Sequence, residues 1–246
     1  SKYGGYYQWK DPLAVNNPVS TLDLTNETGQ STRLLNNLSL SYNLPFLKGL
    51  SFNSNLGYDY TIGKKRNLRD PLLKDGDVFN RNGYLFNEDL RNYSALIETY
   101  GIYKTKFKSI NSGMELTFGH SWQETDRENR WEEGNGLEMI GGEYAYTTDI
   151  RKDSFLVQNR LISFFGRANF TVNDKYLLTA SVRRDGSSRF GAENKWGLFP
   201  AVAFGWRILE EDFAEGLNNV FTNLKLRISY GVTGNEDIQH FLYTTF

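Results

Sequence analysis

The chain has 246 residues and a formal net charge of −1, which gives no electrostatic basis for nucleic-acid binding. It contains no cysteine, so disulfides, thiolate chemistry and cysteine-based zinc sites are excluded. Hydrophobic residues make up 39% of the chain and the mean hydropathy is −0.54, with no run of about 18 apolar residues that would form a transmembrane helix.

A low mean hydropathy does not exclude a membrane β-barrel. Only every second residue of a barrel strand must be apolar, because the other face of the strand lines a polar lumen. Phe, Tyr and Trp make up 15% of the chain, and Tyr and Trp favour the interface between membrane and water. The composition is therefore compatible with a barrel that crosses a membrane with strands.

Alternation of apolar and polar residues recurs along the chain and predicts about eight strands. In chain order, the predicted strands cover residues 33–44, 49–62, 92–104, 109–125, 159–172, 175–184, 196–208 and 223–233. The second strand carries Leu50, Phe52, Leu56, Tyr58, Tyr60 and Ile62 on one face and Ser51, Asn53, Asn55, Gly57, Asp59 and Thr61 on the other. This pattern is typical of lipid on one side and water on the other. The strand at 92–104 has the poorest alternation and is assigned mainly by topology.

The lengths of the connections provide a second argument. Short connections are predicted at 45–48, 105–108 and 173–174, and long ones at 63–91, 126–158 and 185–195, after a leading segment at 1–32. Outer-membrane barrels have short periplasmic turns and long extracellular loops. The alternation ends at 209–222, where a helical turn is expected around Glu210 to Leu217. We therefore expect an all-β, antiparallel transmembrane β-barrel, with residues 1–246 as a single barrel segment.

The second half of the chain carries three long ordered motifs. Residues 174–191 read DKYLLTASVRRDGSSRFG, residues 194–213 read NKWGLFPAVAFGWRILEEDF, and residues 224–238 read LKLRISYGVTGNEDI. Upstream, NNLSLSY at 36–42 precedes a strand that ends LGYDY at 56–60. Together these segments resemble the SusC/RagA family of TonB-dependent outer-membrane transporters.

The resemblance implies a barrel of about 22 strands, of which this chain holds about a third, with a plug domain and a TonB-binding motif outside it. It also implies the outer membrane of a Gram-negative bacterium of the Bacteroidota and a SusD-like surface lipoprotein as partner. The cargo would be an oligosaccharide or a peptide. The alternatives are a stand-alone eight-stranded barrel or porin without energised transport, and a soluble all-β binding module.

Two groups of candidate contact residues follow from this arrangement. Trp131, Tyr144 and Tyr146 lie in the predicted loop 126–158, where they would stack on sugar rings or pack the loop on itself or on a partner lipoprotein. A second group faces the predicted lumen, where it would touch the plug or a passing substrate. Its members are Asn53, Asp59, Glu115 and Arg183. We favour plug contact for this second group, because a lumen of this size is normally plugged.

A cluster of charges is expected where the sixth strand leaves the membrane. Arg184, Asp185 and Arg189 follow Arg183 there, and we predict a structural ion-pair network at the base of the loop, with contact to substrate or plug as the alternative. Residues 173–175 predict a tight polar turn at the other end of this strand.

Catalytic chemistry has little support in the sequence. The two histidines, His120 and His240, lie far apart and match no metal-ligand spacing. Oxygen-rich segments at 75–77 and 132–136 could attract a divalent cation, but neither matches a calcium-loop spacing. No catalytic triad, phosphate loop or dinucleotide motif is visible. We therefore expect no enzyme activity, no resident metal and no cofactor.

Overall fold

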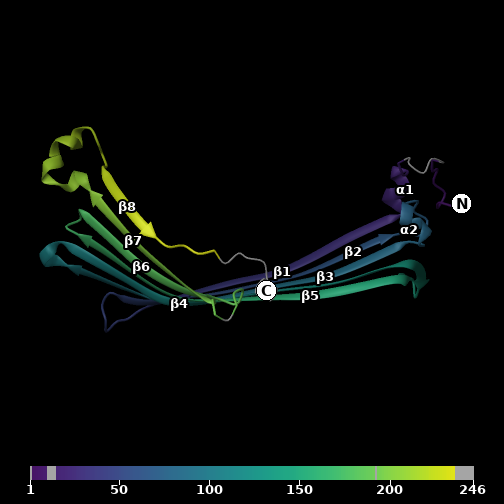
Figure 1. Cartoon of the computed structure of the whole chain (residues 1–246), viewed down its shortest axis with the longest axis horizontal. Coiled ribbons are helices and arrows are strands. Elements are labelled where there is room, and N and C mark those ends of the chain that lie inside the picture. The colour runs from purple at the N-terminus through teal and green to yellow at the C-terminus, as the bar shows by residue number, and fades with distance from the viewer. Residues whose placement is uncertain (1, 10–14, 192, 236–246) are drawn as a thin grey trace. The chain divides into compact units, whose positions relative to one another are not determined.

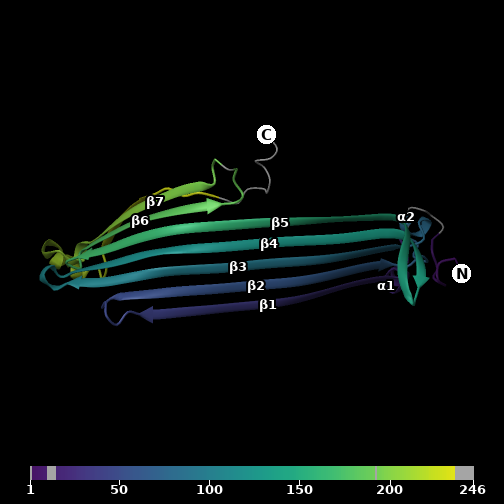
Figure 2. The same cartoon turned by 90° about the horizontal axis from the view of Figure 1, so that it is seen from below.

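A computed structural model describes residues 2–9, 15–191 and 193–235, with the side chains at 76, 77, 109 and 218 left aside. Eight strands form one sheet in which each strand pairs with its neighbours in sequence (Figures 1 and 2). They are β1 (Thr25–Asn43), β2 (Leu50–Arg69), β3 (Tyr84–Phe107), β4 (Ser112–Ile140), β5 (Glu143–Val172), β6 (Tyr176–Ser187), β7 (Trp196–Arg207) and β8 (Lys225–Gly231). Across the described ranges, no helix has the length and apolarity needed to cross a membrane.

Short helices complete the described structure. They are α1 (Pro18–Asp23), α2 (Gly76–Asn80), η1 (Lys108–Ile110), η2 (Ile208–Glu210) and η3 (Asp212–Asn219). η2 and η3 confirm the helical turn predicted around residues 210–217. All eight predicted strands are present, including the weakly patterned one at 92–104, which lies inside β3.

Several predicted strand boundaries were wrong, and the largest error concerns the segment 126–158. It is not a loop, because β4 and β5 continue through it and meet at a tight turn. Gly141 and Gly142 make this turn with φ of 63° and 90°, values that glycine adopts without a steric penalty. Likewise, β2 and β3 leave only residues 70–83 between them, and β1 begins within the predicted leading segment.

The contacts divide the chain into two compact units. Unit 1 comprises residues 1–35, 59–93 and 126–158, and unit 2 comprises 36–58, 94–125 and 159–246. Strands β1 to β5 contribute residues to both units, whereas β6 to β8 belong to unit 2.

Unit 1 has a small apolar core and a capped first helix. Leu73, Leu85 and Leu137 are at most 3% exposed. The side-chain oxygen of Asn17 accepts hydrogen bonds from the backbone N–H groups of the first turn of α1, at 2.9 and 3.3 Å, and proline fills the first helical position. In Figure 1, α1 and α2 lie together at one end of the strands of this unit.

Unit 2 shows the alternation in its strand register. From β5 to β8, one row pairs Ala168, Ala180, Val202 and Tyr230, and another pairs Phe170, Leu178, Phe204 and Ile228. The row between them pairs Asn169, Thr179, Ala203 and Ser229. Apolar side chains therefore share one face, and many are exposed, with Ile228 at 62%. A continuous exposed apolar face is costly in water and stable against lipid.

The connections in unit 2 also follow the sequence. Asn173 and Asp174 have φ of 49° and 55°, which confirms the tight turn between β5 and β6. The connection from β7 to β8 is held to that turn by Glu211, which accepts hydrogen bonds from Tyr176, Lys175 and Trp206.

Candidate functional site

The polar face of unit 2 carries linked charged and polar side chains. Glu115 on β4 pairs with Lys104 of β3 at 2.8 Å, and Asn169 of β5 donates to it at 3.5 Å. Asn169 in turn accepts a hydrogen bond from Thr179 of β6 at 2.9 Å. Four strands are therefore cross-linked on the face that was predicted to line the lumen. Asn53 is half-buried on β2, also within this unit.

Arg183 is held in one position on the same polar face. Its Nε donates to both carboxylate oxygens of Asp185, at 2.8 and 3.0 Å. Its Nη2 donates to Ser163 Oγ at 2.8 Å, and Ser163 is fully buried. The guanidinium also lies 5.9 Å from the ring of Phe165. Two of its three nitrogens are engaged in this way, which orients the Arg183 guanidinium on the polar face.

The charges expected at the loop base separate onto two faces. Asp185 pairs with Arg183, whereas Arg184 lies 4.8 Å over the ring of Trp196. Successive side chains of a strand point to opposite faces, so Arg184 is directed away from Asp185. The backbone N–H of Arg189 donates to Ser187 Oγ at 3.3 Å. The ion pair between Arg183 and Asp185 therefore belongs to the polar face, and Arg184 belongs to the apolar face.

Asp59, the fourth predicted lumen residue, lies in unit 1. Arg33 of β1 binds it in a bidentate pair, with Nε and Nη2 at 2.9 and 2.7 Å from the two carboxylate oxygens. Both side chains are partly exposed, so this pair fixes a geometry more than it adds stability. Whether the four predicted residues face a plug or a substrate stays a prediction.

The three predicted aromatic contacts lie on the extensions of β4 and β5 in unit 1, and all three are half-buried. Trp131 stacks on Phe86 of β3, with ring centroids 6.3 Å apart and an angle of 25° between the planes. The hydroxyl of Tyr144 donates to Asp70 at 2.8 Å. Burial, followed by a hydrogen bond to Glu132, raises the pKa of Tyr146 to about 12. These contacts favour packing of the two-stranded segment 126–158, called the ribbon below, on its neighbours within unit 1. A role of the three residues in ligand binding stays a prediction.

The ribbon of unit 1 also carries a groove that the sequence did not indicate. Its volume is about 820 Å³, within the range of small-molecule sites. Charged, polar and aromatic side chains line it together, namely Asn87, Asp89, Glu128, Arg130, Trp131, Glu132, Lys152, Asp153, Ser154, Phe155 and Leu156. Glu128 is paired with Arg130 and, at 3.6 Å, with Arg91. A groove with this lining can offer both hydrogen bonds and an aromatic surface to a polar ligand.

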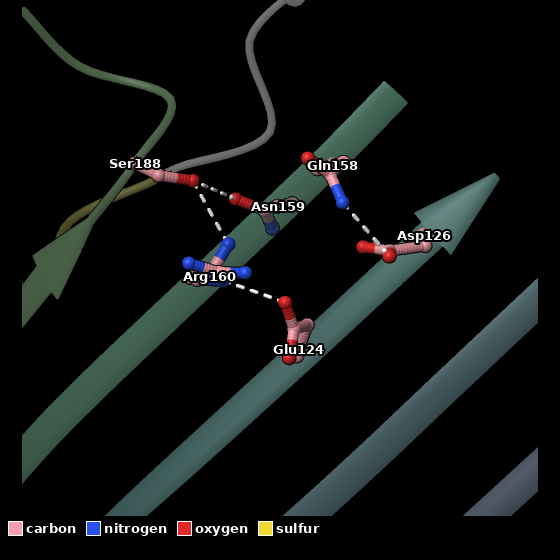
Figure 3. A network of polar contacts seen from close by, with 6 residues as sticks. All are labelled: Glu124, Asp126, Gln158, Asn159, Arg160 and Ser188. Atoms are coloured by element: carbon pink, nitrogen blue, oxygen red, sulfur yellow. Dashed lines mark hydrogen bonds and ion pairs between the residues drawn. The ribbon is translucent and has the colours of Figure 1, made fainter. Parts of the chain in front are cut away.

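Polar side chains of β4 and β5 contact one another, and Ser188 joins them (Figure 3). Within unit 2, Arg160 Nε donates to Glu124 at 2.6 Å, and Ser188 Oγ accepts from the Arg160 N–H at 2.8 Å. Within unit 1, Gln158 donates to Asp126 at 3.0 Å. On β4 the same strand face carries Phe118, His120 and Trp122 immediately before these acids. The sequence therefore indicated these contacts, because Glu124 and Asp126 continue, at the same alternate spacing, the row of ring side chains that precedes them on β4.

The segments considered for a divalent cation have other partners. Asp75 accepts from Arg69 at 2.9 Å, while the side chain of Asp77 and all of His240 lie outside the described residues. Glu133 accepts from Tyr84 at 2.6 Å and pairs with Arg151 at 2.7 Å. In the part of the chain that the structure describes, no three His, Asp or Glu side chains are grouped to hold a metal ion.

Comparison with known proteins decides the family. The model of the family described as "TonB dependent receptor-like, beta-barrel" matches residues 1–239. The chain belongs to this family. It is 32% identical over 251 residues to the TonB-dependent receptor SusC of Bacteroides thetaiotaomicron. This match covers 96% of the chain and 24% of SusC. It is 33% identical over 248 residues to the TonB-dependent receptor P39 of Formosa agariphila, covering 94% of this chain and 22% of P39.

Solved structures agree on the fold of this TonB-dependent receptor barrel. The RagAB peptide transporter matches 95% of the chain with a TM-score of 0.78 at 20% identity, and the match covers 26% of the transporter chain. The RagAB peptide importer in its open-open state matches with a TM-score of 0.76. The SusC/RagA resemblance and the antiparallel barrel fold are thus confirmed. The chain spans about a quarter of the length of these relatives.

Proposed function

We propose that the chain is the barrel portion of a TonB-dependent importer in the outer membrane of a Gram-negative bacterium. The observation that carries this proposal is the division of β5 to β8 into an exposed apolar face and a cross-linked polar face. Such a sheet separates lipid from a polar lumen. The family membership and the identity to SusC support a receptor of this class.

The proposed cargo is an oligosaccharide or a peptide, captured with a SusD-like surface lipoprotein and energised by TonB through parts outside this chain. The RagAB relative is a peptide transporter, which supports the peptide alternative. The groove of about 820 Å³ supports a polar ligand of either kind, because it combines charged side chains with the aromatic residues Trp131 and Phe155.

Uptake in cells tests this function. The gene that encodes the chain is deleted, and uptake of defined oligosaccharide and peptide mixtures is measured before and after complementation, with and without a functional TonB. Loss of uptake of one class that requires both the gene and TonB is the expected result. Equal uptake with and without TonB would overturn the importer.

A stand-alone barrel is distinguished by mass. Outer-membrane proteins are extracted in detergent and separated, and the mass of the native polypeptide that contains the sequence of this chain is measured. A mass several times 28.3 kDa is expected for a plugged transporter. A mass near 28.3 kDa would favour a small barrel without energised transport.

A further inference from the structure

A groove of about 520 Å³ is cut into the apolar face of unit 2. Gly166 leaves space in its floor, because it presents no side chain there. The ring of Phe118 lies directly over Gly101, and a Cβ added at Gly166 would only reach ordinary contact with Val182, at 3.9 Å. Phe52 also lines the groove. The result is an apolar trough on a face whose neighbouring side chains are exposed.

One margin of this groove is basic rather than apolar. Arg184 and His120 both line it. Arg184 is exposed and lies over Trp196, whose ring stacks on Phe164 with centroids 6.3 Å apart. His120 approaches Phe164 from the other side, at 5.0 Å between centroids. The three rings and the guanidinium therefore make one row across β4, β5, β6 and β7.

Arg184 is a charged side chain on the apolar face, where an anionic partner would stabilise it. A charged side chain on a lipid-facing surface is costly in the membrane centre and tolerated near the interface. Arg184 pairs with no carboxylate among the described residues, although Asp185 is adjacent in sequence, because Asp185 points to the polar face and binds Arg183. Arg184 lies near the end of β6 that is remote from the tight turn at 173–174. Three of the four connections at the opposite end, 44–49, 108–111 and 173–175, are as short as periplasmic turns, so Arg184 lies at the outer end.

We propose that this groove binds a phosphate-bearing glycolipid of the outer leaflet. An acyl chain lies in the trough, where it buries apolar surface against Phe52, Phe118 and Val182. The phosphate contacts the Arg184 guanidinium, which Trp196 holds in place, with His120 as a second donor. Two observations favour membrane lipid as the occupant. The trough opens onto an exposed apolar face. Among the described lining residues, Arg184 is the cation without a carboxylate partner, and it lies at the outer end.

Native mass spectrometry of the full-length protein in detergent tests this site. The probes are lipid A carrying its phosphates and the same lipid after removal of the phosphates. Wild type is compared with Arg184→Gln and with the matched control Arg167→Gln, whose side chain lies on the polar face of the same sheet, in the row of Ser181 and Ala201. Folding of each variant is checked by its heat-dependent mobility on gels.

Arg184→Gln is expected to weaken binding of the phosphorylated lipid by about tenfold, the loss of one charge-assisted contact. Arg167→Gln should bind like wild type, and the dephosphorylated lipid should not distinguish the three proteins. Equal affinities of Arg184→Gln and wild type would overturn the proposal, as would equal binding of both lipids by wild type.

A second variant tests the trough without changing Arg184 or His120. Gly166→Leu places a side chain over the floor of the groove and is expected to weaken both lipids to a similar extent. If it folds and binds both lipids like wild type, an acyl chain does not occupy the trough and the proposal fails. These measurements involve no transport, so they stand or fall separately from the importer function.

Discussion

Tyr176 donates a hydrogen bond of 2.6 Å to Glu211, which joins the start of β6 to the connection between β7 and β8. Lys175 and Trp206 donate to the same carboxylate, each at 3.0 Å. These donors, Tyr176 first, hold the pKa of Glu211 down at about 2. A connection of residues 208–224, longer than the other turns at this end, is thereby fastened to the sheet by Glu211, and Asp212 adds an ion pair with Lys175 at 3.5 Å.

The first prediction concerns the pH dependence of this contact. Because the pKa of Glu211 is lowered from 4.5 to about 2 on folding, its contribution is complete above pH 4.5 and is lost as the pH falls towards 2. Hydrogen exchange of residues 208–224, corrected for intrinsic rates, should be constant from pH 7 to 5 and faster in more acidic solution. Glu211→Gln should raise exchange several-fold at pH 7, whereas the exposed control Glu215→Gln should not. Equal exchange in both variants would contradict the assigned role.

The second prediction concerns Asp185. Asp185→Asn removes the negative partner of Arg183 but keeps the size of the side chain, so it should lower barrel stability by about 1 kcal/mol, the upper value for a partly exposed ion pair. The midpoint of heat-dependent unfolding on gels measures this. Asp89→Asn, at an exposed position of β3, serves as the control. If Asp185→Asn unfolds at the wild-type temperature, the ion pair with Arg183 does not stabilise the barrel.

The third prediction uses the hydroxyl of Tyr84. Burial, followed by its hydrogen bond to Glu133, raises the pKa of Tyr84 from 10 to about 12. Since the pKa is raised on folding, the stabilising contribution is complete below pH 10 and is lost as the pH rises through 12. Subtracting the ultraviolet titration of Tyr84→Phe from that of wild type should show one tyrosine that ionises near pH 12. A difference curve centred near pH 10 would show that the hydroxyl is not engaged.

The face that each strand residue of unit 2 occupies could be predicted, because each strand there separates lipid from water. The alternation at Ala168, Phe170 and Val172 gives the shared face, and the pairing of Ala168 with Ala180 follows once the tight turn at 173–175 fixes the alignment of β5 and β6. The separation of Arg184 from Asp185 onto opposite faces follows from the same alternation. The sequence analysis missed it because it grouped these charges by their distance along the chain.

The ribbon at 126–158 could not be predicted from apolar periodicity. Both of its faces are polar, with Glu128 and Arg130 on one of them, and a hydrogen-bonded ladder does not require apolar side chains. The groove of unit 1 was missed for the same reason. Its lining residues come from β3, β4 and β5, and only their pairing brings Asp89 and Lys152 to one groove.

The last prediction removes this ribbon. Gln158 donates to Asp126 directly across β4 and β5, so the two strands can be joined there by a two-residue Asn-Gly turn, which suits a hairpin. The deletion removes Trp131, Tyr144 and Tyr146 and nine of the eleven residues that line the groove, but it keeps the Arg160–Glu124 pair. The barrel should assemble with normal heat-dependent mobility, and uptake of the cargo should fall at least tenfold, since each hydrogen bond to a polar ligand contributes about 1 kcal/mol.

A matched control shortens only the tip of the ribbon. Removing residues 138–145 and restoring a glycine turn leaves every lining residue of the groove in the chain. This variant should retain most of the uptake, because Trp131 and Phe155 remain, although it loses the hydrogen bond from Tyr144 to Asp70. If both deletions reduce uptake equally, the tip rather than the groove contacts the cargo or its lipoprotein. If neither reduces uptake, the ribbon has no part in capture, and recognition lies on the polar face around Glu115 and Arg183.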